Sequence, residues 1–183
     1  MFATEAYEPN VALARERLGP LGVTVLPYRS DDLVGGPLPF DDASLDVVLD
    51  RHESYDAREV ARVLAPSGRF LTQQVDGENL ADLLGLFRAM PAVPDVRLVR
   101  FVADATRADL TIEHAEQWWG YSTFSDVGAL VYYLKAIPWS VPGFSVATHE
   151  SVLRELQTRL EREGSLRFRA GRFLIVARKD SAA

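Results

Sequence analysis

Short apolar runs alternate with helix-like segments over the first half of the chain, and this alternation restricts the fold more than any other feature of the sequence. Residues typical of buried strands cluster in four predicted strands, at 2–4, 23–26, 45–49 and 69–75. Apolar residues at helical spacing predict helices between them at 9–18 and 57–64. Strands that alternate with helices form a mostly parallel sheet with helices on both faces. The sequence therefore predicts an α/β fold.

The second half of the chain departs from that order. Helices are predicted at 79–90, 96–108, 126–137 and 148–163. A strand is predicted at 110–116, and the segments 166–169 and 172–177 resemble a bent strand or a hairpin. These late segments suggest an antiparallel strand pair at one edge of the sheet. The length of 183 residues fits a single domain over 1–183.

Composition excludes several function classes. The chain has no cysteine, which excludes disulfides, thiolate catalysis and cysteine-ligated metals, and its three histidines give little basis for another metal site. A net charge of −6 argues against a nucleic-acid-binding surface. No apolar run approaches the ~20 residues of a membrane span, and no signal pattern opens the chain. We expect a cytoplasmic protein with no metal, membrane or nucleic-acid partner.

Polar side chains follow the predicted strands at the positions where open parallel sheets bind ligands, the carboxyl ends. Glu5 follows the first strand, Asp31 the second, Arg51 and His52 the third, and Asp76 the fourth. An acidic side chain at such a position can accept hydrogen bonds from both hydroxyls of a ribose. The alternative for each carboxylate is a solvated loop residue, and both interpretations stay open at this point.

Three segments resemble class I S-adenosylmethionine-dependent methyltransferases, of the type 11-like group. Residues 2–6 resemble the family's second strand and acidic motif, and residues 38–48 resemble its LPF-x-D-x-S-F-D-x-V segment, with Leu45 in place of Phe. Residues 59–71 are similar to its E-x-x-R-V-L-K-P-G-G-x-F segment, with Ser67 in place of one glycine. The resemblance implies a Rossmann-like, mostly parallel sheet with helices on both faces, a C-terminal antiparallel strand pair, and S-adenosylmethionine as cofactor.

The resemblance also implies roles for individual residues. Glu5 would bind the ribose of the cofactor, and Ala6 and Tyr7 would line its adenine ring. Ser30 and Asp31 would face the adenine amine, and Arg51 and His52 would lie beside the methionine end. His52 is then the candidate general base, because an unperturbed imidazole with a pKa of about 6.5 is largely neutral at pH 7. A loop histidine with a structural hydrogen bond is the alternative, since methyl transfer can proceed by alignment alone.

One departure from the family pattern concerns the front of the chain. Family members begin with a central strand and a glycine-rich loop, whereas this sequence contains no G-x-G and starts about where the second strand ends. We expect an N-terminally truncated fold with a cofactor-side half at 2–75 and a substrate-side half at 76–183. A late start codon, a fragment and a remodelled fold all remain open. A sheet without its middle strand has two unpaired edges, which close packing or strand exchange in a dimer would relieve.

Aromatic and basic residues in the second half allow two interpretations each. The aromatic side chains of 118–121 and 132–144 could form a substrate lid or pocket wall, or pack at the edge of the core. Arg167, Arg169 and Arg172 could bind a partner or a phosphate, or line the solvated face of an edge strand. We expect His114 and His149 to face solvent.

The sequence thus favours a methyltransferase that transfers a methyl group from S-adenosylmethionine to an oxygen or nitrogen of a small molecule. The alternative is a non-catalytic binding or assembly protein with a residual methyltransferase fold, forming a homodimer by strand exchange. The missing glycine-rich loop favours this alternative, and the polar strand ends favour the enzyme.

Overall fold

The predicted alternation of strands and helices is present in a computed structural model, which describes residues 1–29 and 36–181. The elements in chain order are β1 (Phe2–Glu5), α1 (Glu8–Leu18), η1 (Gly19–Leu21), β2 (Thr24–Pro27), β3 (Leu45–Arg51), α2 (Ala57–Val63), β4 (Leu64–Val75), α3 (Ala81–Leu86), α4 (Leu98–Arg107), β5 (Leu110–Phe124), α5 (Val127–Ala136), α6 (Glu150–Glu163) and β6 (Leu166–Lys179).

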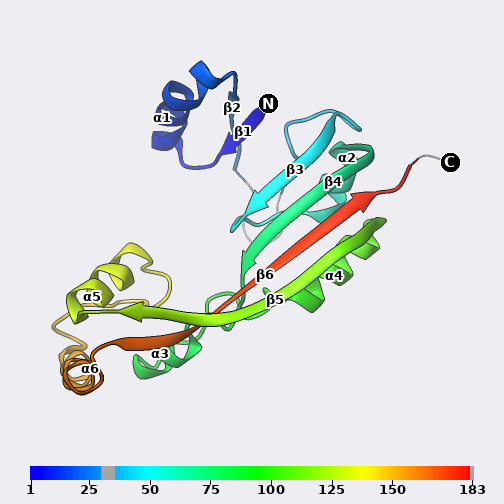
Figure 1. Cartoon of the computed structure of the whole chain (residues 1–183). Helices are drawn as coiled ribbons and strands as arrows, with labels where there is room; N and C mark the ends of the chain where they lie inside the picture. The colour runs from blue at the N-terminus through cyan, green and yellow to red at the C-terminus, as the bar shows by residue number, and fades with distance from the viewer. Residues whose placement is uncertain (30–35, 182–183) are drawn as a thin grey trace. The chain divides into compact units, whose positions relative to one another are not determined.

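The strands form two sheets. Strands β1 and β2 pair in parallel, with Phe2 opposite Thr24 and Glu5 opposite Pro27. The other sheet has four strands in the order β3-β4-β6-β5. Figure 1 shows β3 and β4 running in the same direction and β6 running against both of its neighbours. The antiparallel C-terminal pair is therefore confirmed. The described strands are thus divided between two separate sheets.

The chain divides into two compact units. The first contains residues 1–72, 102–114 and 175–183, and the second contains 73–101 and 115–174. Strands β4, β5 and β6 each contribute residues to both units. This division does not follow the boundary at residue 75, so the assignment of cofactor-side and substrate-side halves stays a prediction.

The first unit is built from two pieces of βα structure. Helix α1 lies against β2, where Val11 and Val25 are buried and Arg15 Nε donates to the Val25 carbonyl at 3.3 Å. Helix α2 begins at Asp56, whose carboxylate accepts from the backbone N–H of Arg58. Figure 1 shows α2 and α4 on the same face of the four-stranded sheet. The most deeply buried side chains of this unit come from these two helices and from the strands, and they include Val60, Val63, Phe70, Ala105, Ile175 and Ala177.

The second unit has its own apolar core, formed by α3, α5, α6 and the first half of β6. Its buried members are Leu80, Leu83, Leu84, Phe87, Leu130, Leu134, Val141, Leu153, Leu156, Leu166 and Phe168. The amphipathic pattern predicted at 148–163 places Leu153 and Leu156 of α6 in this core. Helix α6 ends at Gly164, which has a φ of +75° and donates its N–H to the Leu160 carbonyl.

The hairpin interpretation of the last segments is wrong, because β6 is a single strand from Leu166 to Lys179. Ala170 and Gly171 interrupt the alternation of the sequence, which suggested a bend or hairpin there. In the structure Gly171 instead makes room for a neighbouring ring, since a Cβ at this position would lie 2.4 Å from Cζ3 of Trp119. Strand β5 likewise extends to Phe124, well beyond the predicted end at residue 116.

Strand β3 has the apolar sequence of a buried strand but lies at an edge of its sheet. Val47 is 53% exposed and Leu49 is 74% exposed. The prediction of a buried strand is therefore wrong for these side chains. Sequence pattern reports which surfaces a strand is suited to bury, whereas its place in the sheet decides what covers them.

Two further features concern the described residues only. None of their helices combines the length and the apolar character needed to cross a membrane. The same residues hold no group of three or more histidine, aspartate and glutamate side chains arranged to bind a metal ion. These findings leave the compartment and the partners of the protein as predictions.

Replacing Ser67 by glycine is expected to stabilise the protein by about 0.5–1 kcal/mol. Ser67 has a φ of +66°, a left-handed conformation that glycine adopts without steric cost. The resemblance places glycine at this position. Urea unfolding of Ser67→Gly and Ser67→Ala would measure the effect. Ser67→Ala keeps the strained backbone and loses only an exposed hydroxyl contact with Ser181, so a gain in that variant would contradict the explanation.

Candidate functional site

The first candidate group lies where β1 ends and the chain turns into α1. Glu5 is half-buried, and its Oε1 accepts a 2.7 Å hydrogen bond from the backbone N–H of Tyr7. This bond fixes the carboxylate at the turn and satisfies an N–H at the start of α1. Ala6 and Tyr7 follow directly, and the Tyr7 side chain is 64% exposed. The turn therefore presents a carboxylate and an aromatic ring together at the carboxyl end of a parallel strand.

The segment that follows β2 is held at both of its described ends. The backbone N–H of Tyr28 donates to the Glu5 carbonyl at 3.0 Å, which continues the pairing of β1 with β2. The Tyr28 hydroxyl donates to the Gly36 carbonyl at 2.8 Å and accepts from the Gly36 N–H at 3.2 Å. Ser30 and Asp31, the predicted partners of an adenine amine, lie outside the described residues, so their placement stays a prediction.

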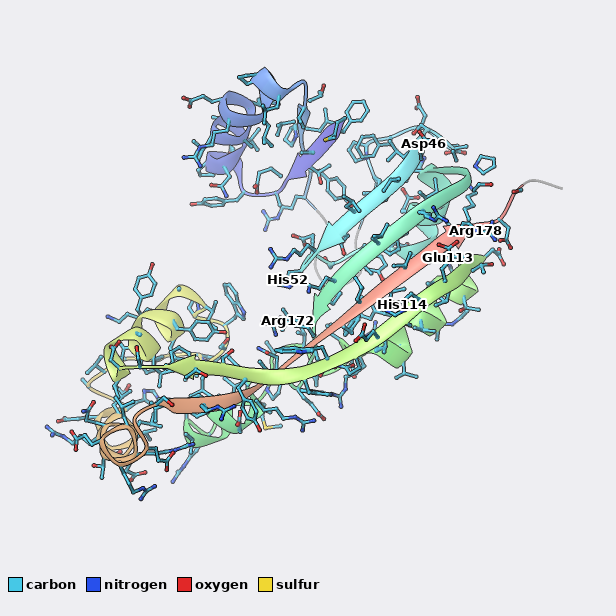
Figure 2. The ribbon with its side chains drawn as sticks, viewed as in Figure 1. Asp46, His52, Glu113, His114, Arg172 and Arg178 are labelled. Carbon is cyan, nitrogen blue, oxygen red and sulfur yellow. The ribbon has the colours of Figure 1, made fainter. Side chains whose placement is uncertain are left out.

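The second candidate group lies at the carboxyl end of β3, which Figure 2 marks with His52. Arg51 is the last residue of the strand, and both Arg51 and His52 are exposed. His52 has a φ of +62°. A non-glycine residue in this conformation stores strain, and such residues are concentrated at functional sites. The backbone thus gives His52 a property that sequence reasoning did not foresee.

Polar residues beneath this strand end are tightly packed. The Thr72 hydroxyl donates to Asp50 Oδ2 at 2.8 Å, and Thr72 is 1% exposed. The Tyr55 ring packs edge-on against Phe70 with their centroids 4.8 Å apart. Burial, followed by the negative charges of Asp50 and Asp104, raises the pKa of the Tyr55 hydroxyl well above its usual value. Tyr55 is therefore a neutral phenol at physiological pH.

Arg62 joins two of the three segments that carry the family resemblance. Its guanidinium donates to the carbonyls of Leu38 and Phe40, and it forms ion pairs with Asp42 and Glu59. Glu59 also accepts from the backbone N–H of Leu38 at 2.9 Å. The hydrogen bond from Arg62, aided by the one from Leu38, lowers the pKa of the Glu59 carboxyl. The Glu–x–x–Arg spacing thus serves to hold residues 38–42 against α2.

Strand β4 ends in a third polar group, in the second unit. Asp76 is 3% exposed, and its Oδ1 accepts from Arg97 Nη1 at 2.9 Å and from the Glu78 N–H at 2.8 Å. The Arg97 guanidinium also pairs with the exposed Glu78, whose pKa it lowers. Nearby, Asn79 Oδ1 accepts from Arg172 Nη1 at 2.6 Å. Sequence reasoning noted Asp76 as a strand end but gave it no partner, because Arg97 lies 21 residues away.

Aromatic residues of β5 lie beneath arginines of β6. The Arg169 guanidinium lies 3.9 Å from the ring centroid of Trp119, and the Arg167 guanidinium lies 4.2 Å from that of Tyr121. Strand β6 has β4 and β5 as neighbours. The expectation that its arginines line an edge strand is therefore wrong, and two of them cover aromatic rings instead.

The remaining aromatic residues and histidines have mixed environments. Phe144 packs against Phe87 at a centroid distance of 5.8 Å and stacks on His149 at 5.4 Å. This contact places His149 partly inside the core, contrary to expectation. His114 is exposed on the edge strand β5, as expected. Tyr132 and Trp139 are 77% and 62% exposed, so the aromatic residues serve both the core and the surface.

The structure thus brings the predicted residues together in two local groups. Glu5, Ala6 and Tyr7 share the turn between β1 and α1, and Arg51 and His52 share the end of β3. Each group follows the carboxyl end of a strand that has a parallel neighbour. Their assignment to a cofactor stays a prediction.

Comparison with solved structures identifies the fold. The chain is similar to a protein from Bacillus halodurans described as a "putative methyltransferase", with 16% identity, a TM-score of 0.61, and coverage of 98% of this chain and 83% of that one. It is also similar to the YcgJ protein from Bacillus subtilis, with 20% identity, a TM-score of 0.62, and coverage of 99% and 82%. A third similar structure is geranyl diphosphate methyltransferase in complex with S-adenosylmethionine, at 12% identity, a TM-score of 0.52, and coverage of 97% and 68%.

These similarities show that the chain has the fold of class I S-adenosylmethionine-dependent methyltransferases. At 12–20% identity they show the fold alone. No protein-family model matches the sequence, and no curated protein matches it either. The activity must therefore be argued from the site.

Proposed function

We propose that this protein is an S-adenosylmethionine-dependent methyltransferase that acts in the cytoplasm on a small molecule, transferring a methyl group to an oxygen or a nitrogen. The observation that carries the proposal is the carboxylate of Glu5, held at the carboxyl end of a parallel strand by the N–H of Tyr7. In open parallel sheets this position is suited to bind a ribose. The methyltransferase fold supplies the context for that carboxylate.

The chemistry of these residues fits the adenosine end of the cofactor. The Tyr7 backbone N–H already donates to Glu5 Oε1, so Glu5 Oε2 would accept a hydrogen bond from a ribose hydroxyl. The exposed Tyr7 ring would pack against the adenine. Ala6 would contact the adenine ring, Ser30 and Asp31 would bind the adenine amine, and Arg51 would bind the methionine end. S-adenosylmethionine, when bound, supplies an electrophilic methyl group. His52 would take the proton of the acceptor, because a neutral imidazole accepts a proton near pH 7.

A second candidate function is binding or assembly without catalysis. Two observations favour it: the sequence contains no G-x-G to approach the methionine end of the cofactor, and β3 exposes apolar residues at a sheet edge. A calorimetric titration of the 183-residue protein with S-adenosylhomocysteine separates the two candidates. Saturable binding supports the methyltransferase. A flat titration would contradict a cofactor site formed by these residues and leave the assembly function.

Glu5→Ala is expected to weaken binding of S-adenosylhomocysteine by about 1–3 kcal/mol, because charge-assisted hydrogen bonds to the ribose are lost. The same titration measures the change. Glu8→Ala is the matched control, since Glu8 is an exposed glutamate in the first turn of α1. Equal affinities for the parent protein and Glu5→Ala would remove Glu5 from the ribose role.

A further inference from the structure

The edge of β3 is a surface that belongs neither to the proposed cofactor site nor to the core. Four of its seven residues are apolar, and Val47, Val48 and Leu49 form an uninterrupted run. Apolar residues on both faces are typical of strands in the interior of a sheet whose two faces are both covered. In the four-stranded sheet, however, the only described neighbour of β3 is β4. Val47 and Leu49 lie on the same face of β3 and are 53% and 74% exposed.

The opposite edge of the same sheet carries polar side chains on both of its faces, whereas one face of β3 carries three apolar side chains in succession. Strand β5 presents the polar residues Thr111, Glu113 and His114 within the first unit. Glu113 forms ion pairs with Arg69 at 3.0 Å and with Arg178 at 3.3 Å, and Figure 2 shows Glu113 and Arg178 together. Polar and charged side chains on an edge strand discourage pairing with another chain. No charged residue interrupts the exposed apolar run of β3.

The two faces of β3 differ. Asp50 accepts from the buried Thr72, so Asp50, Val48 and Asp46 share the face of Thr72. Leu45, Val47 and Leu49 lie on the other face and form an apolar row that ends at Arg51. A partner strand at this edge must therefore place apolar side chains beside this row and avoid placing an acid opposite Asp46 or Asp50.

We propose that β3 pairs antiparallel with β3 of a second copy of this chain, in a two-fold dimer centred on Val47. In this register Val47 lies opposite the partner's Val47, and Leu45 lies opposite the partner's Leu49. The apolar row of each copy then meets the same row of the other, which is the self-complementarity that a two-fold interface requires. The proposal concerns this edge alone and does not depend on methyl transfer.

Charge and apolar contact together select this register from the alternatives. Centring on Leu49 would place Val47 opposite the partner's Arg51 and would leave Leu45 without a partner within β3. Centring on Val47 places Asp46 opposite the partner's Val48, so no two acids meet. Centring on Val48 would instead place Asp46 opposite the partner's Asp50 twice, and like charges directly opposite each other destabilise a strand pair. A second copy of the chain thus supplies the apolar row that the edge lacks without creating a charge conflict.

Val47→Cys tests the register. The chain has no cysteine, so the introduced thiol is unique, and in the proposed dimer it lies opposite its own copy. Mild oxidation is expected to convert most of this variant into a disulfide-linked dimer on a non-reducing gel. Val99→Cys is the matched control, because Val99 is 78% exposed and lies on α4 rather than on β3, and it is expected to remain mostly monomeric under the same treatment. Equal cross-linking of the two variants would overturn the register.

Val47→Lys tests the interface itself. Sedimentation equilibrium of the parent protein is expected to show a reversible dimer. The variant places two lysines opposite each other at the two-fold axis, and its dimer dissociation constant should rise at least about tenfold. Val99→Lys controls for the added charge and should leave the dimer intact. A parent protein that is monomeric at every concentration overturns the proposal, as does a dimer that Val47→Lys does not weaken. Circular dichroism confirms that each variant is folded.

Discussion

Replacing Asp76 by alanine is expected to lower the free energy of unfolding by about 2–4 kcal/mol. Asp76 is 3% exposed, and its carboxylate accepts both from the Arg97 guanidinium and from the Glu78 N–H. Alanine would leave the buried side of Arg97 and a backbone donor without their acceptor. A buried donor that loses its acceptor lowers stability by more than the hydrogen bond had contributed, because water cannot take the acceptor's place.

Urea unfolding of Asp76→Ala, with Glu78→Gln as the matched control, measures this effect. Both carboxylates pair with Arg97, but the Glu78 side chain is 48% exposed, whereas that of Asp76 is 2% exposed. Solvent can replace the Glu78 interaction, so its loss should be much smaller. Asp76→Asn should fall between them, since an amide oxygen still accepts a hydrogen bond but carries no charge. If Asp76→Ala and Glu78→Gln lose equal stability, burial is not what gives the Asp76 pair its importance.

Phe168→Ala should cost about 3–5 kcal/mol of unfolding free energy, the usual range for removal of a fully buried aromatic side chain. Phe168 is 1% exposed in the core of the second unit, where its ring lies 6.2 Å from that of Phe124 and the Arg159 guanidinium lies 5.7 Å away. The loss combines the transfer free energy of the removed ring with the cost of the cavity left between α6 and β6.

The same unfolding measurement on Tyr132→Ala provides the control for Phe168. Tyr132 is an aromatic residue of α5 in the same unit but is 77% exposed, so its removal should change stability by no more than about 0.5 kcal/mol. Phe168→Leu, which keeps much of the apolar volume, should lose less than Phe168→Ala. A Phe168→Ala variant as stable as Tyr132→Ala would show that β6 is not anchored in this core.

Local pattern predicted most elements because their chemistry is local. The apolar faces of α2 and α6 follow from helical spacing, and the start of α2 follows from the cap at Asp56. The hairpin interpretation around Gly171 failed because that glycine makes room for Trp119, which lies on a different strand. The extension of β5 through 118–121 was missed for a similar reason, since its aromatic residues are supported by arginines of β6.

The candidate site, like the fold, could be predicted from the sequence only where its residues are close together in the chain. The rule that ligands bind at the carboxyl ends of parallel strands selects Glu5 and His52 from sequence. It could not foresee that Glu5 binds the Tyr7 N–H or that His52 has a left-handed backbone. Nor could it give Asp76 a partner, because residues distant in sequence meet only when the chain folds.

The sequence by itself determined the fold class, since strand and helix periodicity and the three family-like segments are properties of consecutive residues. Tertiary structure decided the rest. It divided the strands into two sheets, placed β3 at an edge, and surrounded β6 with two neighbours. Pairing between strands depends on backbone groups that every residue carries, so the sequence of β3 specifies its apolar faces but not which strand will lie beside them.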